Sequence, residues 1–333
     1  MTDAASTPNS PMPAEQATAL TRQVRDALET VIVGKRSQIE LVLCGLLAGG
    51  HVLLEDLPGL GKTLLARSLA QVMGLTVGRV QFTPDLMPAD VTGSLLFNQQ
   101  THEFTFRQGP IFNNVIIADE INRAPPKTQA ALLEAMQERQ VTVDGVSHPL
   151  PRPFMVLATQ NPIEFEGTYP LPEAQIDRFI LRTSLGYPSQ DDDAEIIRRR
   201  LSRRRDDVTL TATVDQANVV VMQATLEDVV VSDSIIEYCV ALVHATRASG
   251  QVQAGASPRG VEALVKLARA RAMLADRNYV TPDDVKSIAM PALAHRIVLR
   301  PELWVRGMQA DAVVKEALAS VPTPSTLPTD SSQ

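Results

Sequence analysis

The segment 53–63, LLEDLPGLGKT, constrains the fold of this chain more than any other feature. It joins a short apolar run, HVLLE, to an apolar helical pattern, TLLARSLAQVMG, through Gly59, Gly61, Lys62 and Thr63. This order is typical of a phosphate-binding (Walker A) loop. The glycines let backbone N–H groups approach phosphate oxygens, the lysine reaches the terminal phosphates, and the hydroxyl holds Mg²⁺. A strand, such a loop and a helix in succession predict an α/β nucleotide-binding domain.

One position departs from the usual pattern, because Asp56 stands where the first glycine is expected. Asp56 lies upstream of the expected N–H cluster, where only a turn is needed, and Asp tolerates a left-handed backbone better than most residues. We therefore expect a working loop rather than a glycine-rich turn with a chance lysine. The predicted nucleotide-binding residues of this loop are Pro58, Gly59, Leu60, Gly61, Lys62, Thr63 and Leu64.

Two acids, Asp119 and Glu120, follow the apolar run VIIA. Successive strand residues point to opposite sides, so the two carboxylates need not share one task. We expect Asp119 to bind Mg²⁺ together with Thr63, directly or through water, and Glu120 to polarise the attacking water. Two acids at a strand end are often only a solvated terminus. Here they follow a phosphate loop at a typical distance, which favours a catalytic (Walker B) assignment.

Strand and helix patterns alternate as far as Tyr187, and the later part of the chain is helical. Strands are expected over 51–55, 77–82, 114–120 and 154–161, and helices over 37–50, 63–74 and 127–139. These elements predict a parallel sheet with helices on both faces. We divide the chain into a disordered tail (1–15), a large α/β domain (16–187), a helical lid (188–319) and a second disordered tail (320–333), because both tails are rich in Pro, Ser and Thr.

Two segments interrupt this alternation and are predicted to be β-hairpins. Segment 94–109 has alternating flanks around a polar turn, and segment 140–150 carries Asp-Gly at its turn. From these patterns alone, both could be ordinary connecting structure.

Composition disfavours several classes of function. The net charge of −7 and the pI of about 5.3 favour neither a nucleic acid nor an anionic membrane as partner. The arginine run over 198–205 is flanked by acids, so we expect a solvated, salt-bridged helix face. Cys44 and Cys239 match no metal-ligand spacing, which indicates buried thiols in a reducing compartment. We see no signal peptide and no apolar run long enough to span a bilayer, so we expect a cytoplasmic protein.

Five segments together resemble the MoxR family of AAA+ ATPases. They are VIVGKRSQIE, DLPGLGKT, VIIADEINRAPPKTQAALLEAMQE, ATQNPIEFEGTYPLPEAQIDRF and SPRG, and the likeness extends over about residues 20–310. Within that family an Asp at position 56 is no anomaly. The resemblance implies an AAA+ fold, in which a P-loop parallel sheet with helices on both faces is followed by a small helical lid, and it implies ATP and Mg²⁺ as ligands.

The resemblance also implies roles for further residues. These are Val33 and Gly34 at the adenine pocket, Asn161 as sensor 1, Arg178 as the arginine finger, and Arg259 as sensor 2, reaching from the lid to the γ-phosphate. Without the family, Asn161 could equally cap backbone groups in a loop, Arg178 could pair with Asp177, and Arg259 could be an ordinary arginine at a helix start. The two hairpins match inserts that, in ring-shaped relatives, point toward the pore and handle the client.

The implied function is a Mg²⁺-dependent ATPase that forms a homo-oligomeric ring, expected to be a hexamer. It would remodel or activate partner protein complexes in a chaperone-like way, with a von Willebrand factor A domain protein as a possible client. Three alternatives stay open at this point. A nucleic-acid motor related to the MCM helicases is disfavoured by the acidic pI. A small-molecule kinase would need no arginine from a neighbour, and intact Lys62, Asp119 and Glu120 disfavour a scaffold that only binds ATP.

Overall fold

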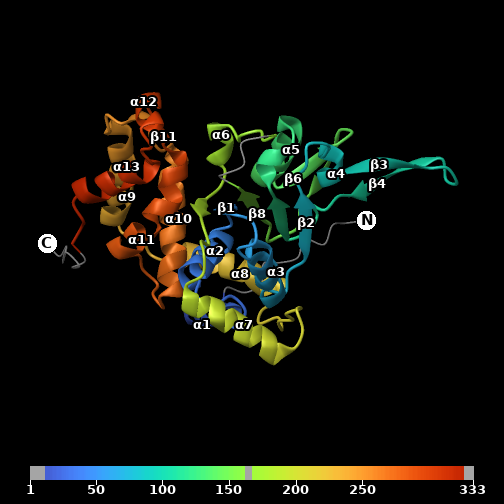
Figure 1. Cartoon of the computed structure of the whole chain (residues 1–333), viewed down its shortest axis with the longest axis horizontal. Helices are drawn as coiled ribbons and strands as arrows, with labels where there is room; N and C mark the ends of the chain where they lie inside the picture. Colours follow the sequence, from blue (N-terminus) through green and yellow to red (C-terminus); the bar gives the residue numbers. More distant parts are fainter. Residues whose placement is uncertain (1–11, 162–166, 326–333) are drawn as a thin grey trace.

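The structure is a computed structural model that describes residues 12–161 and 167–325. Its centre is a sheet of five parallel strands in the order β2-β5-β8-β1-β9 (Figure 1). The strands are β1 (Val52–Glu55), β2 (Val77–Gln81), β5 (Val115–Asp119), β8 (Met155–Gln160) and β9 (Leu181–Thr183). The prediction of a parallel α/β sheet is therefore confirmed, and the carboxyl ends of all five strands meet at one edge.

Helices cover both faces of this sheet because its central strands alternate between two apolar cores. In β1, Val52 and Leu54 point into one core and Leu53 points into the other. The first core contains α2 (Arg36–Leu47) and α3 (Lys62–Val72), and the second contains α5 (Pro126–Glu138) and the short α4 (Pro88–Thr92). The sheet is thus a rigid support from which the loops at its two edges project.

Both predicted hairpins are present. One pairs β3 (Gly93–Asn98) with β4 (Glu103–Gln108), and the other pairs β6 (Gln140–Val143) with β7 (Val146–Pro149). The second turns at Asp144 and Gly145, whose φ angles of 50° and 79° are those that an Asp-Gly hairpin turn requires. The first hairpin extends far from the body of the molecule (Figure 1).

The amino-terminal helix α1 (Ala14–Glu29) corrects one sequence expectation. Residues 1–15 were predicted to be a disordered tail, but α1 begins at Ala14 and Met12 is buried. The reason is that α1 is amphipathic and packs its apolar side, including Val24 and Leu28, into the first core against α2 and α3. Residues 1–11 and 326–333, where most of the two predicted tails fall, lie outside the described residues.

The second half of the chain is helical, as predicted. It contains α6 (Glu173–Ile176), α7 (Gln190–Arg203), α8 (Gln216–Thr225), α9 (Asp233–Ala248), α10 (Pro258–Leu274), α11 (Pro282–Leu293), α12 (Pro301–Val305) and α13 (Ala310–Ser320). Short 3-10 turns lie at Ile121–Arg123 (η1), Leu226–Asp228 (η2) and Ala294–Arg296 (η3), and Val252–Ala254 (β10) pairs with Val298–Leu299 (β11). Side chains cap two of these helices: Ser257 caps α10, and Thr281 with Asp284 forms a capping box on α11.

These helices do not all belong to one separate bundle. Helices α9, α10, α11 and α13 pack together, whereas α8 packs against α1 and α2, and Gln223 Nε2 donates to the Leu46 carbonyl at 2.6 Å. Helix α10 also contacts α1 and α2, so residues on both sides of Tyr187 share the first core. The expected boundary after Tyr187 therefore divides the sequence but not the apolar core. Within the described ranges, no helix has the length and apolarity needed to cross a bilayer.

Candidate active site

The phosphate loop lies between β1 and α3, at the carboxyl edge of the sheet. Gly59 and Gly61 have φ angles of 83° and 84°, and a Cβ placed on either would meet no atom within 4 Å. Gly61 is the N-cap of α3, whose first N–H groups have no partners within the helix. Left-handed glycines beside open space, at a helix start, fit a polyphosphate, because backbone donors and the helix dipole both favour an anion there.

Asp56 has a function that its sequence position did not reveal. It does not adopt the left-handed backbone that its residue type would permit, and only 6% of it is exposed. Its carboxylate accepts hydrogen bonds from the backbone N–H groups of Leu185 and Gly186, at 3.0 Å for Gly186. The Asp56 carbonyl accepts one from Lys62 Nζ at 2.7 Å. Asp56 thus ties the phosphate loop to the segment that follows β9, a contact that requires the tertiary structure to be seen.

Lys62 is the first residue of α3 and is the cation of the loop. Partial burial lowers its pKa, while the nearby carboxylates of Asp56, Asp119 and Glu120 act in the opposite direction. A lysine held by a carbonyl and surrounded by acids is positioned to exchange these partners for phosphate oxygens.

A cavity of about 470 Å³ opens beside the loop. Its lining includes Val31, Ile32, Val33, Gly59, Leu60, Gly61, Leu64, Leu185, Gly186, Tyr187, Pro188 and Ile196. Val33 therefore lines a cavity that also includes the glycines of the loop, and its role at the adenine stays a prediction. Gly34 is next to it with a φ of 70°, and a Cβ there would lie 2.2 Å from the Asp192 carboxylate. The size and the largely apolar wall suit a nucleoside, with the phosphates directed toward the loop.

Asp119 is the last residue of β5 and is 6% exposed. Its Oδ2 accepts from Arg79 Nε at 2.7 Å, and its Oδ1 accepts from the Thr159 hydroxyl at 3.4 Å. Together with Thr63 at the start of α3, this buried carboxylate fits the oxygen-rich surroundings that Mg²⁺ prefers.

Glu120 leaves the strand in a left-handed conformation, with a φ of 57°. Its Oε2 accepts from Gln81 Nε2 at 2.9 Å and from Arg123 Nη1 at 3.0 Å. Different partners thus hold Glu120 and Asp119, which agrees with separate tasks. Gln81 was not predicted from the sequence, because its position opposite Asp119 depends on the pairing of β2 with β5.

Asn161 directly follows β8, the strand between β5 and β1, and is 8% exposed. The parallel register brings it to the same edge as Asp119 and the phosphate loop. The next residues, 162–166, belong to the run that most resembles the family and lie outside the described residues.

Arg178 lies near the amino ends of the strands, whereas the phosphate loop lies at their carboxyl ends. It precedes β9, where Leu181 is in register with Val52, the first residue of β1, and the Ile180 N–H donates to the His51 carbonyl at 2.9 Å. The phosphate loop, in contrast, follows Glu55 at the other end of β1. Arg178 is half-buried, and its Nε has no hydrogen-bond partner among the described residues.

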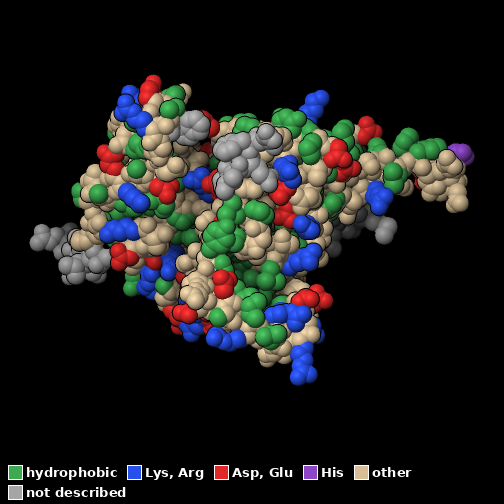
Figure 2. All heavy atoms as spheres, in the orientation of Figure 1, with side chains coloured by type: hydrophobic (Ala, Val, Ile, Leu, Met, Phe, Trp, Pro, Cys, Tyr) green, Lys and Arg blue, Asp and Glu red, His purple; other side chains and the backbone are tan. Residues whose placement is uncertain are grey.

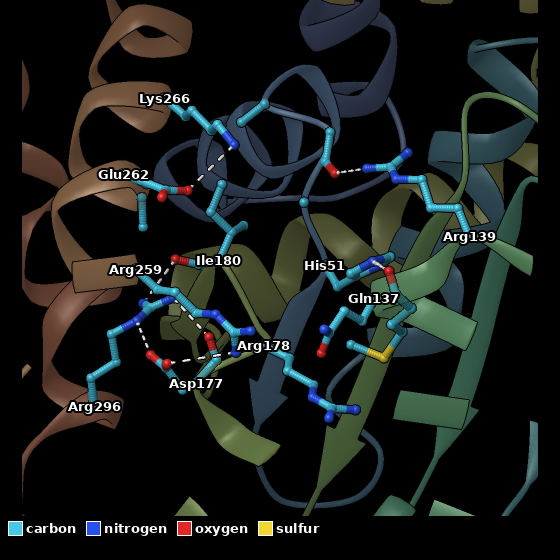
Figure 3. Close-up of a pocket in the computed structure, with 15 residues that line it drawn as sticks. His51, Gln137, Arg139, Asp177, Arg178, Ile180, Arg259, Glu262, Lys266 and Arg296 are labelled. Carbon is cyan, nitrogen blue, oxygen red and sulfur yellow. Dashed lines mark hydrogen bonds and ion pairs between the residues drawn. The ribbon is translucent and has the colours of Figure 1, made fainter. Parts of the chain in front are cut away.

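A second cavity, of about 320 Å³, surrounds Arg178 (Figure 3). Five cationic side chains and two carboxylates line it: Arg139, Arg178, Arg259, Lys266, Arg296, Asp177 and Glu262. The surplus of positive charge would attract an anionic group presented from outside.

Arg259 lines this second cavity, beside Asp177, and is not among the residues that line the cavity at the phosphate loop. Its expected contact with the γ-phosphate stays a prediction. Its Nη1 is 3.8 Å from the Asp177 carboxylate. Helix α10 packs along α1 and α2, and its start lies beside the segment that carries Arg178 (the finger segment), near the amino ends of the strands. Within the described residues, the Asp177 carboxylate pairs with Arg259 and Arg296, so the alternative pairing with Arg178 is not seen.

The arginine run on α7 forms ion pairs with neighbouring acids, as expected. Arg199 pairs with Glu195 at 2.8 Å and Arg200 pairs with Asp206.

Cys44 and Cys239 are both buried free thiols, and burial raises the pKa of each to about 12. They therefore stay protonated and are not candidates for nucleophilic chemistry.

Comparison with known proteins agrees with this geometry. A family model described as ATPase family associated with various cellular activities (AAA) matches residues 51–181, and one described as AAA lid domain matches residues 244–317. The protein YeaC of Bacillus subtilis (strain 168) is 49% identical over 298 residues, which cover 89% of this chain and 92% of that protein. The chaperone MoxR1 of Mycobacterium tuberculosis is 41% identical over 306 residues, which cover 89% of this chain and 80% of MoxR1.

A solved structure from Cytophaga hutchinsonii has the same fold, with a TM-score of 0.88 and 39% identity, and the match covers 94% of this chain and 97% of that one. The likeness therefore extends over nearly the whole chain. The chain belongs to the MoxR family of AAA+ ATPases.

Proposed function

We propose that this protein is a Mg²⁺-dependent ATPase that works as a homo-oligomeric ring, which we put at six subunits, and uses ATP hydrolysis to remodel or activate partner proteins. The reaction converts ATP and water to ADP and phosphate without a covalent intermediate. Support comes from the family, from the open glycine loop at the start of α3, and from the two separately held carboxylates at the end of β5.

Each residue of the carboxyl edge has a role in this proposal. Lys62 and the first N–H groups of α3 bind the phosphates, and Val33 with the apolar wall of the cavity binds the base. Thr63 and Asp119 hold Mg²⁺, which neutralises charge on the phosphates when bound. Glu120 accepts a proton from the attacking water, and Asn161 orients that water by a hydrogen bond.

The observation that carries the ring proposal is the distance between Arg178 and its own phosphate loop. They lie at opposite ends of β1, whose four residues span roughly 13 Å. A cation that stabilises the transferring phosphoryl group contributes about 10³–10⁵ in rate, or roughly 4–7 kcal/mol of barrier. A subunit that cannot apply its own Arg178 to its own ATP needs a neighbour, and assembly then controls hydrolysis.

The exposed surface of the first hairpin is suited to binding a protein client. Phe97 and Phe104 contact each other there, with ring centroids 5.2 Å apart, yet they are 50% and 68% exposed. Figure 2 shows hydrophobic side chains along this projecting hairpin. Exposed aromatic pairs on a protruding ribbon can bind apolar segments of another protein.

We propose a von Willebrand factor A domain protein as the client. We propose the cytoplasm as the compartment, because ATP is available there and thiols stay reduced.

The test is a mixing experiment with Arg178→Ala and Glu120→Gln subunits. Glu120→Gln subunits have a dead site and an intact finger, whereas Arg178→Ala subunits have an intact site and no finger. Each variant alone should release phosphate very slowly. In mixed rings an Arg178→Ala site receives a neighbour's finger, so about a quarter of the sites in an equimolar mixture should regain activity.

Two controls complete the test. Lys62→Ala subunits, which cannot bind ATP productively, should fail to rescue Glu120→Gln sites, because neither partner then has a working site. Light scattering and pull-down of tagged subunits must show that mixed assemblies form. Mixed rings that form without any gain in rate would rule out the shared site. Client proteins can then be identified by pull-down with Glu120→Gln protein in its ATP-bound state.

A further inference from the structure

The lid contacts the segment that carries Arg178, and most of its hydrogen bonds to this segment come from one residue, Arg296. The Arg296 side chain is 3% exposed and comes from η3, directly after α11. Its Nε donates to the Asp177 carboxylate at 2.8 Å, and its Nη2 donates to the carbonyls of Asp177 at 3.2 Å and Phe179 at 2.8 Å. Its Nη1 donates to the Ile180 carbonyl at 3.2 Å. One guanidinium therefore binds the backbone on both sides of Arg178.

Two other lid residues reinforce this contact. The Ser257 hydroxyl, at the start of α10, donates to the Asp177 carboxylate at 2.9 Å. His295 Nε2 lies 3.0 Å from the Phe179 carbonyl, and burial, followed by the charge of Arg296, lowers the pKa of His295 well below its ordinary value. The same Nε2 lies 2.9 Å from Arg296 Nη1, so the neutral imidazole packs between the Arg296 guanidinium and the Phe179 carbonyl. We call Ser257, His295 and Arg296 the lid clamp. Figure 3 shows Arg296 and Arg259 directed toward Asp177.

We propose that Arg296 is a positioning residue for Arg178: the lid of each subunit sets the finger that this subunit offers to its neighbour. The inference rests on the proposed shared site. The finger segment has little regular structure to hold it, because α6 has four residues and none of them is buried. Two local backbone bonds, from Arg178 N–H to Gln175 and from Phe179 N–H to Ile176, and the buried Phe179 ring fix part of it. The carbonyls of Asp177, Phe179 and Ile180 are held from outside by Arg296, and the Ile180 N–H by the His51 carbonyl.

The chemistry of Arg296 suits this role better than simple packing of the lid. Burial lowers the pKa of Arg296, and the Asp177 carboxylate opposes that effect, so the pair keeps a charge inside the protein. Buried ion pairs often add little stability compared with apolar residues of the same volume. A planar guanidinium, however, offers five donors in fixed directions, and here it orders one carboxylate and three carbonyls of a single turn. Lysine has the same charge but cannot reproduce this geometry.

If Arg296 positions the finger, the lid of one subunit is coupled to the active site of the adjacent subunit. A movement of η3 or of the start of α10 would shift Asp177 and Phe179, and with them the Arg178 backbone. Because a displacement of about 1 Å in a catalytic group can change a rate 10²-fold, small lid movements would be enough to switch the neighbouring site. The lid would then act on the ATP of the adjacent subunit.

The test is Arg296→Lys, with Arg277→Lys as the matched control. Arg277 is also a lid arginine with a well-buried carboxylate partner, Asp284, and among the described residues its hydrogen bonds and ion pairs are not with the segment that carries Arg178. We expect Arg296→Lys to lower kcat about 10- to 100-fold with an unchanged KM for ATP, because its own nucleotide cavity is at the other edge of the sheet. Arg277→Lys should leave kcat unchanged.

Two further measurements separate positioning from a general loss of structure. Mixing Arg296→Lys with Glu120→Gln subunits should restore activity to the level of the Arg178→Ala mixture, because the Glu120→Gln subunits have intact clamps. The double variant Arg178→Ala/Arg296→Lys should be no slower than Arg178→Ala alone, since Arg296 acts only through Arg178. Asp177→Asn, which keeps the side-chain volume, replaces Arg296→Lys if that variant does not assemble.

The outcomes distinguish this inference from the proposal on which it rests. If Arg178→Ala mixtures recover and Arg296→Lys mixtures do not, or if the double variant is slower than Arg178→Ala, Arg296 is not a positioning residue for the finger. An unchanged kcat in Arg296→Lys also overturns the inference. If Arg178→Ala mixtures themselves fail to recover, the shared site is wrong, and the control by a neighbour's lid is wrong with it.

Discussion

The backbone N–H of Gly186 donates to the carboxylate of Asp56 at 3.0 Å, although the two residues are 130 positions apart in the chain. Asp56 begins the phosphate loop, and Gly186 belongs to the wall of the nucleotide cavity. A single buried carboxylate thus ties the start of the phosphate loop to the wall of the cavity beside that loop.

Replacing Asp56 by glycine restores the usual first residue of a phosphate loop, yet we expect it to impair this protein. The N–H groups of Leu185 and Gly186 would lose a charged acceptor, at a cost of about 2 kcal/mol in unfolding free energy. ATP affinity should fall as well, because the cavity wall is no longer fixed. Urea unfolding and titration with a fluorescent ATP analogue measure both effects, with the exposed-loop variant Asp207→Gly as control. Unchanged ATP affinity in Asp56→Gly would show that the tie is not needed for binding.

The two acids at the end of β5 should give different phenotypes when each loses its charge. Asp119→Asn should weaken the Mg²⁺-dependent part of ATP binding, because it removes a ligand charge from the expected metal position. Glu120→Gln should bind ATP with nearly the parent affinity but turn over about 10²–10⁴-fold more slowly, since an amide cannot accept the proton. The measurements are ATP affinity with Mg²⁺ and with EDTA, and phosphate release. Exchanged phenotypes would mean that the roles of Asp119 and Glu120 are reversed.

Much of this molecule could be predicted because its signals are local. An apolar strand, a glycine loop and a helix start lie next to one another in sequence, so β1, Lys62 and α3 were predictable from residues 51–74 alone. The hairpin turn at Asp144 and Gly145 was likewise set by its two residues. The start of α1 was missed because a sequence rich in Pro, Ser and Thr precedes it, and its burial depends on distant helices.

The missed parts of the site are contacts between residues far apart in the chain. The tie from Asp56 to Gly186, the hold of Gln81 on Glu120 and the clamp of Arg296 on Asp177 each join different elements. None is visible before the strand order and the packing of α10 and α11 are known. The position of Arg259 beside Asp177 could not be predicted for the same reason, since the sequence locates the start of α10 but not the strand ends beside which it lies.

Acid should destabilise the fold through His51, which is fully buried. Its Nδ1 accepts from the Val156 N–H at 3.0 Å, so Nε2 carries the proton and donates to the Met136 carbonyl. Burial lowers the pKa of His51 from 6.5 to about 4. The unfolded chain therefore binds more protons below pH 6.5, and the stabilisation present above pH 6.5 is lost as the pH falls toward 4.

The expected loss is about 2 kcal/mol at pH 5 relative to pH 7.5, and about 3 kcal/mol at pH 4. Urea unfolding at these pH values measures it. His51→Gln should be less stable at pH 7.5 and should show a smaller fall toward pH 5, whereas His102→Gln, at the exposed turn of the first hairpin, should follow the parent. If His51→Gln and the parent lose the same free energy, protonation of His51 is not the cause.

The last prediction concerns Arg259, which lies 3.8 Å from Asp177 in the same cavity as Arg178. Because Arg259 lines this cavity and not the one at the phosphate loop, we expect Arg259→Ala to keep the parent affinity for ATP. ATP should still protect the chain near Pro188 from proteolysis, because that segment borders the subunit's own nucleotide cavity. The rate of phosphate release should fall about 10-fold or more, as expected when one cation is removed from a shared transition-state site. Mixing with Glu120→Gln subunits should restore part of that rate, as it should for Arg178→Ala. A loss of ATP-dependent protection in Arg259→Ala, with no recovery on mixing, would instead show that Arg259 acts on its own subunit's nucleotide.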